Sequence, residues 1–145
     1  MVTHPRSRAS GSRPAVAAVE LAVLLPFLMF VFVVGVDFAR VFYHCITLTN
    51  CARNGALYGS IDPSYAKDTS GIQNAALIDA GDLAPQTPSV NSKTGNDASG
   101  YPYVSVTVTG TFQTITRYPG IPSPMTVART VEMRVTPYVP ANSTP

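Results

Sequence analysis

The chain has 145 residues, of which 46% are hydrophobic and 12% are charged, about half the charged share of an ordinary globular protein. This length accommodates one domain and excludes a large multidomain enzyme. The net charge of +2 is small and spread along the chain, so no nucleic-acid partner is expected. The low charged share raises the question of where the apolar residues are concentrated.

The apolar residues concentrate near the N-terminus. Residues 1–14 are rich in Ser, Arg, Gly and Pro and have almost nothing to bury, so we predict a disordered cytoplasmic leader. The segment 15–36 then carries a single charge, Glu20, and is apolar on every side of a helix. Because about 20 mainly apolar residues cross a bilayer, we predict a transmembrane helix over 15–36, surrounded by membrane lipid.

The charges on either side of this segment predict its orientation. Arg6, Arg8 and Arg13 precede it without an acidic residue, whereas Asp37 and Arg40 follow it and offset each other. Basic flanks stay cytoplasmic, so we expect the N-terminus inside and the C-terminal part outside, in the periplasm or at the cell surface. A cleaved secretory signal is the alternative. The length of the apolar run and the lack of a small-residue cleavage site after it favour an uncleaved single-pass anchor.

The helical pattern continues beyond the membrane segment. Apolar residues recur every three or four positions, so residues 37–59 are predicted to extend the same helix as an amphipathic segment that Gly59 ends. The whole helix would be about 65 Å long, more than twice the hydrocarbon thickness. The apolar face of the extension is expected to bury against residues 60–137. That face comprises Phe38, Val41, Phe42, Cys45, Leu48, Ala52 and Ala56, and the polar face comprises Arg40, His44, Thr47, Cys51 and Asn54.

Residues 60–137 are predicted to form a small extracytoplasmic α+β domain that starts with a loop and a short helix. A proline indicates a loop over residues 61–69. Ser70 followed by Gln73 is typical of a capping box, and Gly81 is expected to end the helix.

Strands are predicted to follow. Tyr101–Phe112 and Thr126–Thr136 alternate apolar with polar residues and are rich in β-branched side chains, which indicates half-buried strands. Val90 indicates a third strand, residues 92–100 resemble a turn, and residues 138–145 form a flexible Pro-containing tail. The expected architecture is therefore α+β and pilin-like: a long N-terminal transmembrane helix, a short helix and an antiparallel sheet of about three strands.

Two residues of the apolar segment are unusual. A carboxylate such as Glu20 inside an apolar span costs about 2.5–3.5 kcal/mol at the bilayer centre, and residues of this kind usually have a function and a partner. The alternative is that Glu20 lies near the cytoplasmic interface and reaches the headgroups. Pro26 removes one backbone hydrogen bond in the middle of the helix, which loosens it locally.

Three segments of the sequence resemble one known family. The segments AVAAVELAVLLP (residues 15–26), DFAR (37–40) and LTNCARNGALYGS (48–60) are similar to the TadE-like proteins, pilin-like subunits of the tight-adherence (Flp, type IVc) pilus machinery. The resemblance is specific over residues 15–60. It implies a minor pilin or pseudopilin, a structural subunit rather than an enzyme, that helps assemble a tight-adherence pilus or a related secretion apparatus.

The resemblance also implies roles for individual residues. Glu20 matches the pilin glutamate that pairs with the N-terminal ammonium of a neighbouring subunit, which fits the need of a buried carboxylate for a cation. Pro26 matches the family proline. Other pilin-like subunits, the assembly machinery and a prepilin peptidase are the implied partners. The family's helix-end motif falls on Asn50, Arg53 and Gly55.

The processing site departs from the family pattern. Counting back from Glu20 places a cleaved bond between Ala15 and Val16, but the glycine that such peptidases favour is replaced by Ala15. An uncleaved anchored subunit is therefore the alternative.

No catalytic, cofactor-binding or metal-binding site is predicted. His4 and His44 lie on opposite sides of the expected membrane. Cys45 and Cys51 lie about 120° and about 9 Å apart on a helix, too far for a disulfide within one chain. Packing is expected for Cys45, and an intersubunit bond stays an alternative for Cys51. Two other functions remain open: a generic single-pass membrane-anchored binding domain, and a small secreted enzyme with a cleaved signal.

Overall fold

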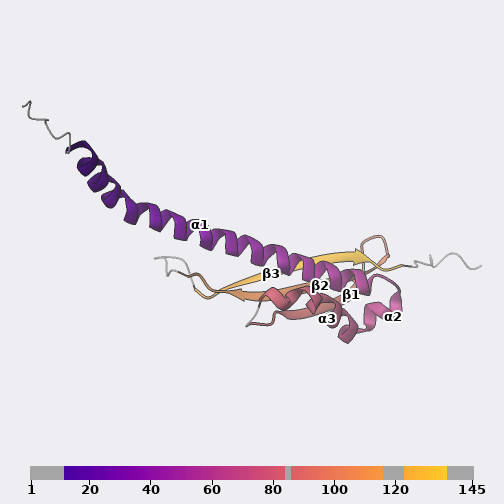
Figure 1. Cartoon of the computed structure of the whole chain (residues 1–145). Coiled ribbons are helices and arrows are strands. Elements are labelled where there is room, and N and C mark those ends of the chain that lie inside the picture. The colour runs from indigo at the N-terminus through magenta and orange to yellow at the C-terminus, as the bar shows by residue number, and fades with distance from the viewer. Residues whose placement is uncertain (1–11, 84–85, 116–122, 137–145) are drawn as a thin grey trace, which may run out of the picture. The chain divides into compact units, whose positions relative to one another are not determined.

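The computed structural model describes residues 12–83, 86–115 and 123–136. The chain forms two compact units, Met1–Val36 and Asp37–Pro145. The long apolar N-terminal helix, the short helix and the three-stranded antiparallel sheet confirm the predicted α+β class. The elements, shown in Figure 1, are α1 (Ser12–Gly59), α2 (Pro63–Lys67), α3 (Thr69–Leu77), the 3₁₀ helix η1 (Ile78–Leu83), β1 (Ser89–Asn96), β2 (Pro102–Phe112) and β3 (Met125–Arg134).

Parts of two predictions cannot be compared with the structure. The predicted leader up to residue 11 and the predicted tail over 138–145 lie outside the described residues.

The sheet of the second unit is an antiparallel meander with β2 in the centre. Val106 of β2 faces Ser92 of β1 on one side and Val131 of β3 on the other. The predicted alternation along β2 is confirmed, because every second residue is buried and those between are half-buried. The buried residues of β2 are Val104, Val106, Val108, Gly110 and Phe112.

The predicted strand near Val90 is longer than expected. β1 continues to Asn96, so the prediction of a turn over residues 92–100 is wrong for its first half. The turn occupies the second half, where the Asp97 carboxylate accepts hydrogen bonds from the backbone N–H groups of Ser99 and Tyr101, both at 2.9 Å. Gly100 has a φ of +83°, which a side chain would oppose. Pairing with β2 overrides the weak strand preference of Gly and Asn in this segment.

The connection between α1 and the sheet also differs from the prediction. The expected loop over residues 61–69 contains α2, which Asp62 caps by accepting from two backbone N–H groups and which begins at Pro63. The N-cap of α3 is Asp68, whose Oδ1 accepts from the Gly71 N–H at 2.9 Å, and not Ser70. Aspartate is as favourable as serine at an N-cap, and Asp68 precedes Ser70 by two positions.

The C-terminal part of α1, from residue 37 onward, packs against one face of the sheet. Helix α3 packs against the same part of α1. Small residues permit this close approach. A Cβ added at Gly55 would lie 3.1 Å from both Ala76 of α3 and Val106 of β2, and one at Gly59 would lie 3.0 Å from Val104. Gly59 therefore ends α1 where the chain passes close to the sheet, and its φ is not positive.

The face by which α1 docks is not the one predicted. His44, Thr47 and Cys51, assigned to the polar face, are buried, whereas Phe38 and Phe42 of the predicted apolar face are 60% and 65% exposed. The predicted burial of Leu48, Ala52 and Ala56 is confirmed. The docked face is therefore rotated from the predicted one toward the side of the helix that carries His44, Thr47 and Cys51. The core cluster comprises Leu48, Cys51, Ala52, Ala56, Ala66, Ile72, Ala76, Ala80, Leu83, Val104, Val106, Val108 and Val135.

Candidate functional site

The apolar part of α1 carries the residues that the family resemblance singles out for assembly. By length and composition the helix can cross a membrane, and its most apolar stretch is not buried in the protein. Glu20 and Pro26 are both exposed, and the helix runs through Pro26 without a break. Ala15 and Val16 lie in the same helix. All four positions are open to lipid or to another helix.

Asp37, the first residue of the second unit, is a buried carboxylate with two described partners. Its Oδ1 accepts a hydrogen bond from the backbone N–H of Ile115 at 2.9 Å and lies 3.3 Å from the Arg40 guanidinium. Only 3% of Asp37 is exposed. The opposed charges of Asp37 and Arg40 are evident in the sequence. The contact with Ile115 is not, because that partner is 78 positions away.

His44 lies one helical turn beyond Arg40 and is buried between α1 and β2. Its ring packs edge-on against Phe112, with centroids 5.6 Å apart, and a Cβ on Gly110 would come within 2.9 Å of its Nε2. Nε2 is buried and has no hydrogen-bond partner among the residues that the structure describes. Burial lowers the pKa of His44 below its ordinary value, because a charged ring would lose its hydration.

Of the three residues of the helix-end family motif, one is buried and two are exposed. Gly55 is buried where α1, α3 and β2 meet. Asn50 and Arg53 are exposed on α1. Gly55 therefore supports the fold directly, whereas Asn50 and Arg53 are available to partners.

Two polar contacts hold the segment after α1 against it. The Asn54 amide donates to an Asp79 oxygen at 2.7 Å, and the Tyr58 hydroxyl donates to Asp68 Oδ2 at 2.9 Å. The hydrogen bond to Asp68 raises the pKa of Tyr58. Hydrogen bonds from the Gly71 N–H and then from Ser70 and Tyr58 lower the pKa of Asp68. The sequence marked neither pair, since nothing in its periodicity brings α3 and η1 beside α1.

Cys51 is fully buried in the same region, which rules out the intersubunit disulfide as long as the domain is folded. Burial and then the negative charge of Asp79 raise the pKa of its thiol, so it stays protonated. Cys45 is half-buried, in keeping with the packing expected for it.

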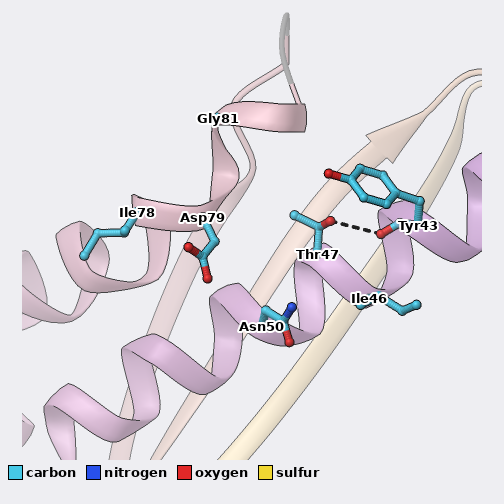
Figure 2. A pocket seen from close by; sticks show the side chains of 7 residues that line it. All are labelled: Tyr43, Ile46, Thr47, Asn50, Ile78, Asp79 and Gly81. Atoms are coloured by element: carbon cyan, nitrogen blue, oxygen red, sulfur yellow. Dashed lines mark hydrogen bonds between the residues drawn. The ribbon is translucent and has the colours of Figure 1, made fainter.

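An open groove of about 360 Å³ lies between α1 and η1 (Figure 2). Exposed apolar side chains flank it, with Ile46 59% and Ile78 76% exposed. In Figure 2 the Thr47 hydroxyl donates to the Tyr43 carbonyl oxygen on the α1 side, so this hydroxyl is already used within the helix. The lining residues are Tyr43, Ile46, Thr47, Asn50, Ile78, Asp79 and Gly81.

The groove has the character of a contact surface. It holds one carboxylate, that of Asp79, which already accepts from Asn54. Over residues 12–83, 86–115 and 123–136 no three His, Cys, Asp or Glu side chains gather in a way that could hold a metal ion.

Comparison with known proteins gives one match. Residues 15–57 match the family model described as TadE-like protein. No curated protein and no solved structure compared with the chain matches it. The matched segment covers the apolar part of α1 and nearly all of its docked part, including Glu20, Pro26 and the helix-end motif. Together with the membrane-crossing character of the helix, the match indicates a membrane-anchored protein of the kind associated with pili. Over this segment, less than a third of the chain, the sequence is similar to TadE-like proteins, as its motifs predict.

Proposed function

We propose that the protein is a TadE-like minor pilin or pseudopilin, a single-pass structural subunit that helps assemble a tight-adherence pilus or a related secretion apparatus. The observation that supports this most is the family match over residues 15–57, because it covers the apolar helix and its docked extension as one unit. In this proposal the N-terminus is cytoplasmic and the second unit is extracytoplasmic, in the periplasm or at the cell surface. Its partners are membrane lipid, other pilin-like subunits and the assembly machinery.

Glu20 is the residue to which the proposal gives the assembly role. It is exposed on the segment 15–36, which carries no other charge, and a carboxylate in a low-dielectric layer is stabilised by a nearby cation. A neighbouring subunit supplies that cation. Pro26, six residues further along, lets the helix bend as subunits pack. A prepilin peptidase is a further partner if the chain is cleaved between Ala15 and Val16, which N-terminal sequencing of the mature protein decides.

Replacing Glu20 tests the proposal. Glu20→Ala in the full chain is expected to lower the recovery of this subunit with other pilin-like subunits severalfold after detergent extraction and affinity purification. Glu132→Ala is the matched control, because Glu132 is exposed on β3 and outside the matched segment. Membrane fractionation and hydrogen exchange of the sheet are expected to stay unchanged in both variants. Equal recovery of the two variants would refute the role of Glu20.

A second candidate is a generic single-pass membrane-anchored binding domain, which the open groove between α1 and η1 favours. In that case the apolar helix is only a tether, and an apolar span of scrambled order keeps full activity. The pilin proposal predicts loss of assembly with the same scrambled span. Full-length protein in the soluble fraction would contradict both.

A further inference from the structure

Large apolar side chains lie uncovered at the end of the second unit where the chain leaves the apolar segment. Phe38 and Phe42 of α1 are 60% and 65% exposed, and Ile115 after β2 is 62% exposed. None of the three joins the buried core cluster. A group of exposed apolar side chains at one end of a domain marks a surface that meets a partner.

The hydrogen bond between Asp37 and Ile115 brings these side chains to the same end. It joins the first residue of the second unit to the residue three positions beyond the end of β2, at 2.9 Å. Phe38 follows Asp37 directly in the chain. The exposed side chains therefore come from two distant segments that one buried contact holds together.

The charges at this end are arranged to suit a lipid surface. The negative charge of Asp37 is withdrawn, with 4% of its side chain exposed, whereas 46% of the Arg40 side chain is exposed. The Arg40 guanidinium lies 5.2 Å from the centroid of the Phe112 ring. What this end presents to its surroundings is apolar surface beside a cation, which complements lipid chains and their phosphate groups.

The positions of Phe38 and Phe42 along the helix also place them near the membrane surface. At 1.5 Å of rise per residue, Phe38 lies about 3 Å and Phe42 about 9 Å beyond Val36, the last residue of the uncharged run. The headgroup layer on each side of a bilayer is about 5–7 Å thick. Phe38 thus falls within this layer. Phe42 lies about 2 Å beyond it, and its side chain tilts back toward the layer because helical side chains point toward the N-terminus. Aromatic side chains are enriched at this interface in membrane proteins.

From these observations we propose that the end of the second unit formed by Phe38, Phe42, Arg40 and Ile115 rests on the lipid headgroup layer. The second unit then contacts the bilayer through apolar side chains on lipid and through Arg40 near phosphate, in addition to its covalent link to the apolar segment 15–36. This inference rests on the membrane anchoring in the proposed function, and it adds a lipid-binding surface on the folded domain.

The chain contains no tryptophan, so single tryptophan variants report on chosen positions without background. The full chain is reconstituted in phosphatidylcholine vesicles that contain brominated lipid as quencher. Ile115→Trp and Phe42→Trp test the surface. Phe30→Trp, in the apolar segment, reports anchoring, and Leu57→Trp, 49% exposed on the same helix, is the control outside the headgroup layer.

We expect Ile115→Trp and Phe42→Trp to be quenched at least twofold more than Leu57→Trp, with blue-shifted emission. If Phe30→Trp is quenched while Ile115→Trp matches Leu57→Trp, the lipid-seated surface is wrong and the anchoring stands. If Phe30→Trp is also unquenched, the anchoring fails, and the inference fails with it. Emission that is blue-shifted without quenching, and that reverts when the protein is diluted in lipid, would assign the surface to a second copy and overturn the inference.

Discussion

His44 is a buried base, and none of the described side chains or backbone groups forms a hydrogen bond with its Nε2. Nε2 faces the backbone of Gly110, and Phe112 covers the ring edge-on. The charged groups nearest along its own helix are Arg40 and the buried Asp37, and the Arg40 guanidinium also lies over the Phe112 ring. A proton on His44 would thus be placed in an apolar contact near a cation. The docked state of α1 requires neutral His44.

The stability of the second unit is therefore expected to fall in mild acid. Burial lowers the pKa of folded His44 below the 6.5 of the unfolded chain. Well above pH 6.5 the ring is neutral in both states, and protonation of His44 does not reduce the free energy of unfolding. As the pH falls below 6.5, the unfolded state binds the proton first, and stability declines until the folded pKa is reached. Each unit of pKa difference corresponds to about 1.4 kcal/mol.

Chemical unfolding of the full chain in detergent, followed by tyrosine circular dichroism between pH 7.5 and 5.0, measures this decline. The matched variant His44→Leu removes the titrating ring and is expected to flatten the profile. The carboxylates of Asp62, Asp68 and Asp97 do not interfere, because hydrogen bonds lower their pKa values and place their titration at more acidic pH. An unchanged slope in His44→Leu would show that another group causes it.

At the scale of elements, the sequence predicts which segments are helix and strand better than it predicts how they face each other. The period-two pattern of β2 leaves one choice of inner face, and that choice is confirmed. α1 offers two faces with apolar residues, one with Phe38 and Phe42 and one with Leu48 and Ala52. The spacing of apolar residues along the sequence does not distinguish these two faces. Docking selects the face with small residues, because Gly55, Gly59 and Gly110 let α1 approach β2 closely.

The same physical reason limits prediction of the candidate site. Glu20 and Pro26 stand out in the sequence because each is exceptional in its own segment. Asp79 and Ile115 do not, because their importance depends on contacts with α1 that span 25 and 78 positions. Local patterns cannot report contacts that only the tertiary fold creates.

Docking of α1 on the sheet is expected to depend on Leu48 and not on Ile46. Leu48 is fully buried against Gly110 and the core, whereas Ile46, two positions earlier, is 59% exposed beside the groove. Leu48→Ala should lower the free energy of unfolding by about 2–5 kcal/mol, since it leaves a cavity. Ile46→Ala should change it by less than about 0.5 kcal/mol. Denaturant unfolding of both full-length variants measures the difference, and equal losses would mean that the docked face is assigned wrongly.

At the scale of the whole molecule, the amino-acid composition is the average of two parts of the chain that differ strongly from each other. The weak charge of the chain comes partly from the apolar segment 15–36, which holds one carboxylate, and partly from a sheet domain that uses Thr, Ser and Asn. Asp37 stands where one changes into the other. It is the first residue of the second unit, and its contact with Ile115 fastens the start of that unit to the end of β2.

Removing this contact is expected to loosen one end of the domain and leave the other intact. Asp37→Ala leaves the Ile115 N–H and the Arg40 guanidinium without their acceptor, which should cost about 1–3 kcal/mol of unfolding free energy. Asp37→Asn keeps an acceptor oxygen for Ile115 and should cost less. Hydrogen exchange on the full chain in lipid locates the effect: protection should drop at Ile115 and persist near Asp97, where the turn and its 2.9 Å ion pair to Arg134 close the opposite end. Protection lost equally at both ends would mean that Asp37 supports the whole domain and not its membrane-proximal end.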